Sequence, residues 1–233
     1  MKDAVGVMKR ATRGLAMLAM AGALAAGVAG CAAIATQAAL SLASPELFAT
    51  MIGDSEVRSE FKESAPLMKK KDWLGLIILA RQKLDRDPKR GQWWEIAGYG
   101  HLQLGENALA RDCFAEAVRL VPEESGAWNF YAYALKNLGD YRRGLEAVQH
   151  SLQIDPYSGT AYVILGDLRR ENGQSQEALA AYNRAIEIDQ ADVFAWYGLG
   201  LIGKRTHDVA LYEKAKKALE QLYKPMVVQL EKA

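Results

Sequence analysis

The chain has 233 residues, of which 50% are hydrophobic and 24% are charged, a composition that excludes an intrinsically disordered chain. Lys and Arg number 29 and Asp and Glu number 28, so the near-neutral balance argues against nucleic acid as a partner. The two cysteines, Cys31 and Cys113, are too few for a disulfide framework and wrongly spaced for a structural zinc site.

The amino-terminal segment has the pattern of a secretory signal. Residues 1–13 contain Lys2, Lys9, Arg10 and Arg13 against a single Asp3, and residues 14–30 contain no charged side chain. A basic stretch followed by an apolar stretch is the layout of a signal peptide that is removed from the mature protein. We therefore predict a signal peptide over residues 1–30.

The end of this segment, Val28-Ala29-Gly30-Cys31, resembles the lipobox of bacterial lipoprotein signals. The resemblance implies cleavage before Cys31, a thioether-linked diacylglycerol on its sulfur and often a third acyl chain on the new amino terminus. Two or more acyl chains hold a protein stably on a membrane, since each buried methylene is worth about 0.8 kcal/mol. In enteric lipoproteins an Asp after the cysteine favours the inner membrane. Ala32 at that place implies the periplasmic side of the outer membrane, with inner-membrane anchoring as the alternative.

Other interpretations of the amino terminus stay open. Apolar residues continue past Cys31, so residues 14–43 could form an uncleaved transmembrane helix. The signal could also be cut elsewhere, which would leave the protein soluble in the periplasm. With cleavage before Cys31, residues 31–56 form a lipidated tether. An acylated Cys31 cannot form a disulfide, so Cys113 is expected to be a buried packing thiol.

From residue 57 onward the sequence repeats with a constant period. Pro88, Pro122 and Pro156 are equally spaced and divide the chain into units 57–90, 91–124, 125–158, 159–192 and 193–226. Corresponding positions hold a large aromatic residue, a small residue four positions later and a turn glycine. In chain order these are Trp94, Trp128, Tyr162 and Trp196, then Gly98, Ala132, Gly166 and Gly200, then Gly105, Gly139 and Gly173. Such a glycine can end a helix and Asp140 can cap the next one, so each unit predicts a helical hairpin.

These size, turn and proline signals resemble tetratricopeptide repeats, whose units are about 34 residues long. The resemblance covers residues 91–226 and implies an all-α superhelix, an α-solenoid of four clear repeats. Residues 57–90 are a degenerate amino-terminal repeat, in which Pro66 is expected to remove a backbone hydrogen bond from the first helix at a cost of about 3 kcal/mol, so that the unit forms an irregular cap. We also expect a turn longer by one residue around Thr206-His207-Asp208, and a C-terminal capping helix over residues 227–233.

In that family the first helices of the repeats line a concave face, which implies a partner-binding groove. The groove residues carried over are Tyr99, Asn129, Tyr133, Lys136, Asp167, Arg170, Tyr197 and Leu201. Tyrosines offer flat apolar area with a polar tip, and Asn129 could hydrogen-bond an extended peptide backbone. The same row could instead pack against neighbouring helices or face water. The run Lys69-Lys70-Lys71 could meet anionic headgroups or be a solvated helix end.

No catalytic grouping is found in the sequence. His101, His150 and His207 occupy different places in different repeats, so they lack the spacing of a metal site, and nucleophile motifs and phosphate-binding loops are missing. We expect no catalytic residue, no metal and no cofactor beyond the lipid on Cys31.

The leading hypothesis is a non-enzymatic, lipid-anchored scaffold that binds envelope proteins. Similar lipoproteins with this repeat serve pilus and secretin assembly. The alternatives are an adaptor for peptidoglycan hydrolases or polysaccharide export, and an enzyme or small-ligand carrier with a pocket inside the superhelix.

Overall fold

The computed structural model describes residues 57–233. The predicted signal peptide 1–30, Cys31, the tether 31–56 and the alternative transmembrane helix over 14–43 lie outside the described residues. Helices and short connections make up the whole described part. In chain order the helices are α4 (Val57–Lys69), α5 (Trp73–Arg86), α6 (Gly91–Gln103), α7 (Asn107–Leu120), α8 (Ser125–Asn137), α9 (Tyr141–Ile154), α10 (Gly159–Glu171), α11 (Ser175–Ile188), α12 (Val193–Thr206), α13 (Val209–Leu222) and α14 (Lys224–Lys232). Between residues 57 and 233 no helix has both the length and the apolar character to cross a bilayer.

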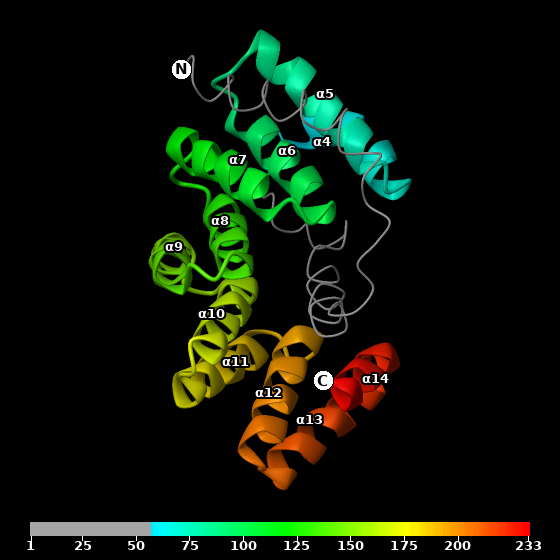
Figure 1. Cartoon of the computed structure of the whole chain (residues 1–233), viewed down its shortest axis with the longest axis vertical. Coiled ribbons are helices and arrows are strands. Elements are labelled where there is room, and N and C mark those ends of the chain that lie inside the picture. The colour runs from blue at the N-terminus through cyan, green and yellow to red at the C-terminus, as the bar shows by residue number, and fades with distance from the viewer. Residues whose placement is uncertain (1–56) are drawn as a thin grey trace, which may run out of the picture. The chain divides into compact units, whose positions relative to one another are not determined.

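Consecutive helices pack as hairpins, and each hairpin packs on the next (Figure 1). The second helices α7, α9, α11 and α13 all have 14 residues, and each begins one repeat period after the one before. The first helices α6, α8, α10 and α12 begin at the same interval. A hairpin of this size cannot bury its apolar side alone and is stabilised by its neighbours. The prediction of an all-α solenoid is confirmed.

The glycines predicted to end the first helices do so by adopting a left-handed conformation. Gly105, Gly139 and Gly173 have φ angles of 75°, 76° and 80°, and a Cβ added at any of them would meet nothing within 4 Å. The backbone angle, not lack of space, therefore favours glycine here. Asp140 caps α9 as predicted, because its Oδ1 accepts a hydrogen bond from the Arg143 amide at 3.3 Å.

The connection between α12 and α13 differs from the prediction, which placed one extra residue in this turn. Helix α12 runs one residue longer than α6, α8 and α10, and α13 still begins in register at Val209, so the connection is shorter, not longer. His207 stands at the register position of the turn glycines and takes a φ of 57°. The offset of Pro225 by one residue therefore arises after α13.

A tryptophan in each of three repeats ties the first helix to the connection before it. The indole Nε1 of Trp94 donates to the carbonyl of Pro88 at 3.0 Å, and that of Trp128 donates to Pro122 at 2.8 Å. Trp196 makes the same bond, 2.9 Å long, to Gln190, the residue that replaces proline in its repeat. Because the acceptor is a backbone carbonyl, the loss of the proline leaves the contact intact.

Large side chains of the second helices pack closely against small residues of the first helices. A Cβ added at Gly98 would lie 2.7 Å from Cε1 of Phe114, and one added at Gly166 would lie 2.5 Å from Cε1 of Tyr182. Cys113 is buried beside this packing, and burial raises the pKa of its thiol to about 12. The interpretation of Cys113 as a packing thiol is confirmed.

The amino-terminal unit is more regular than the expected cap, since α4 continues through Pro66 although the proline removes a backbone hydrogen bond as predicted. A proline cannot donate to the carbonyl four residues before it, which here belongs to Lys62. Both Lys62 and Pro66 are exposed, so this carbonyl can bond water, while Ser64 and Met68 are buried on the other side of the helix. The hydrogen bond that proline removes therefore lies on the exposed side of α4.

Helix α14 begins at Lys224, three residues earlier than the predicted cap over residues 227–233. Pro225 lies in its first turn, where the missing amide has no intrahelical partner in any case. The helix buries Met226, Val227 and Leu230, which form a cluster with Leu219 of α13.

Candidate protein-binding surface

The predicted groove residues lie on the first helices of the four clear repeats. Tyr99 is on α6, Asn129, Tyr133 and Lys136 are on α8, Asp167 and Arg170 are on α10, and Tyr197 and Leu201 are on α12. The first helices contact one another in series, α6 with α8, α8 with α10 and α10 with α12. We call these eight residues the first-helix row. The structure brings its middle members into direct contact.

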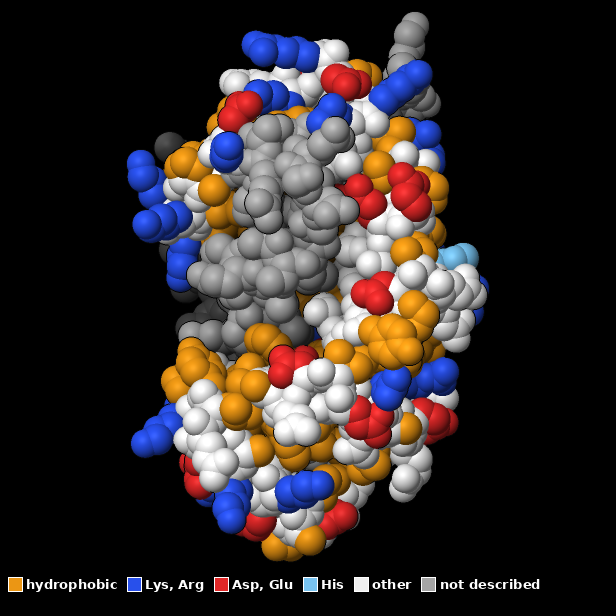
Figure 2. Space-filling model, turned by 180° about the vertical axis from the view of Figure 1, so that it is seen from behind, with side chains coloured by type: hydrophobic (Ala, Val, Ile, Leu, Met, Phe, Trp, Pro, Cys, Tyr) orange, Lys and Arg blue, Asp and Glu red, His pale blue; other side chains and the backbone are white. Residues whose placement is uncertain are grey.

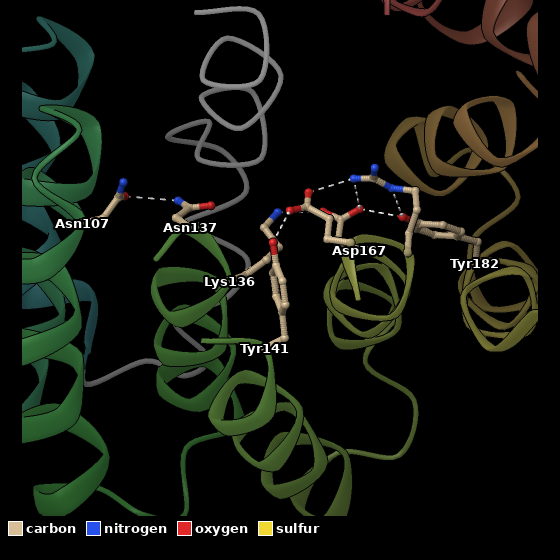
Figure 3. Close-up of polar contacts among 8 residues, drawn as sticks. Asn107, Lys136, Asn137, Tyr141, Asp167 and Tyr182 are labelled. Atoms are coloured by element: carbon tan, nitrogen blue, oxygen red, sulfur yellow. Dashed lines mark hydrogen bonds and ion pairs between the residues drawn. The ribbon is translucent and has the colours of Figure 1, made fainter. Parts of the chain in front are cut away.

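An ion pair between neighbouring repeats lies at the centre of the first-helix row. Lys136 Nζ is 2.8 Å from Asp167 Oδ2, and the two side chains are only 7% and 15% exposed. The hydroxyl of Tyr182, on α11, donates to Asp167 Oδ1 at 2.6 Å (Figure 3). Arg170 adds a longer contact of 4.0 Å to the same oxygen. One carboxylate therefore connects α8, α10 and α11.

Each member of this ion pair helps to keep its partner in the charged form. Burial lowers the pKa of Lys136, but the Asp167 carboxylate, Tyr133 and Glu171 together outweigh burial, and the net pKa lies above its ordinary value. Burial likewise raises the pKa of Asp167, but Lys136 and Arg170 outweigh it, and the net pKa is lowered. Both groups are charged at neutral pH, so they form a structural ion pair and not a proton-transfer couple.

Further contacts neutralise the charge of Arg170, which lies beside the Lys136–Asp167 ion pair. Arg170 lies 2.9 Å from Glu171 Oε1, and Glu171 Oε2 accepts a hydrogen bond from the Tyr141 hydroxyl at 3.4 Å. The Lys136 ammonium also lies 4.4 Å from the ring centroid of Tyr133. Two cations thus face two carboxylates, which leaves no net charge to attract a strongly acidic or strongly basic ligand.

Tyr99, at the amino-terminal end of the row, is fully buried. Its ring makes edge contacts with Trp73 and Phe130, with ring centroids 5.8 Å and 6.2 Å apart. These contacts join the degenerate unit to the first two clear repeats. In this structure Tyr99 therefore serves packing, whereas the sequence pattern placed it among residues that offer area to a partner.

Two acceptor atoms at corresponding positions of the row have no hydrogen-bond partner. Glu95 and Asn129 occupy the same position of successive repeats and are 1% and 2% exposed. Glu95 Oε1 and Asn129 Oδ1 are both buried and unpartnered, although Asn129 Nδ2 donates to Ser158 Oγ at 3.4 Å. Burial, with a smaller effect from Glu124, raises the pKa of Glu95 well above its ordinary value. Glu95 joins the candidate surface through its register with Asn129.

At the carboxyl-terminal end of the row, Tyr197 and Leu201 pack against helix α14. Both are partly buried against the cluster of Leu219, Met226, Val227 and Leu230. Lys204 Nζ holds the end of α14, because it donates to the carbonyls of Leu230 at 3.3 Å and Glu231 at 2.9 Å. The capping helix thus adjoins the last members of the row.

Tyr182, like Tyr141 and Glu171, is a member of this polar network that the sequence pattern did not assign to the site. In the repeat register it corresponds to Phe114 and Val148, at a position of the second helix that favours packing. Its ring does pack, since it is fully buried, but its hydroxyl also reaches Asp167. The available signal was that Tyr182 alone of the three carries a hydroxyl, next to charged residues of α10.

The histidines do not form a site in the described part of the chain. His101 is 7% exposed with its Nδ1 2.6 Å from Glu106 Oε2, and the exposed His150 stacks on Trp128 with centroids 4.6 Å apart. No three His, Cys, Asp or Glu side chains within residues 57–233 are grouped so that they could hold a metal ion.

Family models and known proteins match the repeat region. Residues 97–159 match a model described as tetratricopeptide repeat, and residues 166–205 match one described as TPR repeat. A TPR repeat-containing protein of Rhizobium etli is 27% identical over 114 residues, which make up 49% of this chain and 54% of the relative. The chain spans about half or less of the length of the first curated relatives it matches.

Solved structures share the fold. A thermophilic TPR protein of Thermus thermophilus aligns with a TM-score of 0.66 at 15% identity and covers 75% of this chain and 97% of its own. YrrB, described as a TPR protein with an unusual peptide-binding site, aligns with a TM-score of 0.55 at 16% identity over 73% of this chain and 89% of its own. At such identities the likeness concerns the fold alone. Residues 97–159 and 166–205 are therefore similar to tetratricopeptide repeats, a kind of repeat that mediates contacts between proteins.

Proposed function

We propose that this chain is a lipid-anchored scaffold of the cell envelope that holds a segment of a partner protein along the first-helix row, in pilus or secretin assembly. The observation that carries the binding part is the pair of buried, unpartnered oxygens on Glu95 and Asn129, one repeat apart. A buried polar atom without a partner costs about 1–3 kcal/mol, so a ligand whose polar groups pair with both the Asn129 oxygen and the Glu95 carboxyl is favoured.

An extended polypeptide is the ligand that fits these two acceptors best. Its backbone offers N–H groups at regular spacing, and the acceptors recur with the repeat. Asn129 is held in place by its bond to Ser158 Oγ, so its oxygen needs little reordering on binding. The balanced charges around Lys136 and Asp167 favour a segment of low net charge. The described peptide-binding site of YrrB, a protein of like fold, agrees with this choice.

The envelope location is supported by the sequence Val28-Ala29-Gly30-Cys31 and by the preceding basic and apolar segments. A lipid on Cys31 would keep the scaffold at the membrane, where pilus and secretin components assemble. Mass spectrometry of the mature amino terminus tests this part directly. A diacylated or triacylated Cys31 is expected, and an intact Met1 or an unmodified later residue would contradict it.

Photocrosslinking in intact cells tests the binding surface. A photoreactive phenylalanine analogue at Tyr197, which is partly buried within the row, is compared with the same analogue at Tyr157, which is 71% exposed in the α9–α10 connection. We expect a discrete protein adduct from Tyr197 and none from Tyr157. An Asn129→Ala change should reduce the Tyr197 adduct about fivefold, since one hydrogen bond is worth about 1 kcal/mol.

A deletion strain distinguishes the proposed client from the alternatives. Loss of pili supports the pilus or secretin role, whereas altered cell shape or lysis would point to an adaptor for peptidoglycan hydrolases.

Adducts of equal yield from Tyr197 and Tyr157, or an Asn129→Ala variant with unchanged adducts and unchanged helicity, would remove the first-helix row from consideration.

A further inference from the structure

The amino-terminal hairpin carries exposed apolar side chains where the later repeats carry none of this size. Leu74 and Ile78 lie one turn apart on α5 and are 59% and 49% exposed. The corresponding positions of α7, α9, α11 and α13 hold small or polar residues: Ala108 and Asp112, Arg142 and Glu146, Gln176 and Ala180, Ala210 and Lys214. Packing between repeats does not explain the difference, because the same positions are occupied without large apolar groups elsewhere.

Three exposed lysines directly precede these apolar residues. Lys69 ends α4, and Lys70 and Lys71 form the turn into α5, where Lys71 has a φ of 55°. All three are exposed, and their ammonium groups pair with no carboxylate in the part of the chain that the structure describes. The one acidic residue beside them, Asp72, is engaged as the cap of α5 and accepts from the Gly75 amide at 2.9 Å.

We infer that Lys69, Lys70, Lys71, Leu74 and Ile78, here called the basic-apolar patch, dock the first hairpin onto an anionic lipid surface. Lysines attract anionic headgroups, and adjacent apolar side chains enter the boundary between headgroups and acyl chains. Three lysines with no acidic residue among them are followed here by two exposed apolar side chains within residues 69–78. Over the lower part of the view in Figure 2, which shows other repeats, blue and red side chains are intermingled.

The place of the basic-apolar patch in the chain agrees with this occupant. Helices α4 and α5 are the first described elements and lie side by side at the amino-terminal end of the stack (Figure 1). The inference rests on the proposed lipid on Cys31 for its membrane. A lipid on Cys31 would attach the scaffold at one point, and a single point of attachment does not set its orientation. A second contact at the first hairpin would fix its orientation.

The test uses the full-length acylated protein in vesicles of phosphatidylethanolamine and phosphatidylglycerol. A polarity-sensitive fluorophore is attached to Ile78→Cys, and in a matched control to Glu146→Cys, the corresponding position two repeats later. Cys113 is buried and does not compete for the label. We expect the label at 78, and not the label at 146, to shift to the blue and to be quenched by nitroxide-bearing lipids. Replacement of phosphatidylglycerol by phosphatidylcholine should remove the effect.

A charge variant and an anchor variant separate the possible failures. Lys69→Gln, Lys70→Gln and Lys71→Gln together should reduce the quenched fraction about tenfold without changing helicity. A Cys31→Ala protein that is still quenched at 78 when vesicles are in excess supports the patch, whether or not the substitution reduces vesicle retention; retention that does not change would count against the anchor alone. Equal water exposure of both labels would overturn the inference, as would protection of the label at 78 by an envelope protein in the absence of lipid.

Discussion

The buried ion pair between Lys136 and Asp167 predicts an asymmetric cost of mutation. Asp167→Asn leaves the Lys136 ammonium, only 7% exposed, without its counter-charge, and such a loss costs about 3–5 kcal/mol of unfolding free energy. Lys136→Met should cost less, about 1–3 kcal/mol, because the Asp167 carboxylate keeps its 2.6 Å bond from Tyr182 and its contact with Arg170.

Urea unfolding followed by far-ultraviolet circular dichroism measures both values, and the double variant completes a cycle. Because Lys136→Met removes the charge that Asp167→Asn would strand, the double variant should cost at least about 1 kcal/mol less than the sum. The control is Arg142 with Glu146, a pair 2.6 Å apart but 78% and 56% exposed, for which Glu146→Gln should cost about 0.5 kcal/mol or less. If Asp167→Asn costs no more than Glu146→Gln, or if the cycle is additive, the assigned role of the pair is wrong.

Other parts of the chain give three further expectations. Glu95 holds its proton in the folded state to a pH well above 4.5, whereas the unfolded chain releases it near 4.5, so stability should fall as pH rises through this window. Glu95→Gln should flatten that slope and raise the unfolding free energy at neutral pH, as urea titrations on both sides of pH 4.5 will measure. Pro66→Ala should restore the missing amide in α4 and slow its hydrogen exchange, by up to about 3 kcal/mol in local opening free energy, and unchanged exchange would contradict this. Gly203→Ala should destabilise the last hairpin by about 2 kcal/mol or more, since its Cβ would lie 2.7 Å from the Tyr212 backbone nitrogen, and thermal unfolding compared with Gly159→Ala provides the check.

The hairpin fold could be predicted from sequence because each repeat signal acts locally. Gly139 ends a helix through its own φ angle, and Trp128 reaches a carbonyl only six residues away. The exceptions also have local causes. His207 was not recognised as a turn residue because a left-handed non-glycine residue is uncommon. The unit around Pro66 was expected to be irregular because the solvent exposure of Pro66 is not visible in the sequence.

The polar network could not be predicted in the same way. Lys136 and Asp167 belong to different repeats and meet only because α8 and α10 pack side by side. The Tyr182 hydroxyl reaches the pair from a helix of the opposite layer, and the burial of Tyr99 depends on Trp73 from the degenerate unit. Repeat register places these residues on helices, but the crossing of the helices decides which of their atoms touch.

The Tyr182 ring, between Gly166 of its own hairpin and Gly198 of the next, has a mechanical consequence. Its atoms fill the space that a Cβ at either glycine would need, while its hydroxyl is bonded to Asp167. Bending at this joint would require the ring to leave both backbones and break that bond. We therefore expect the hairpins α10–α11 and α12–α13 to move as one stiff segment under load.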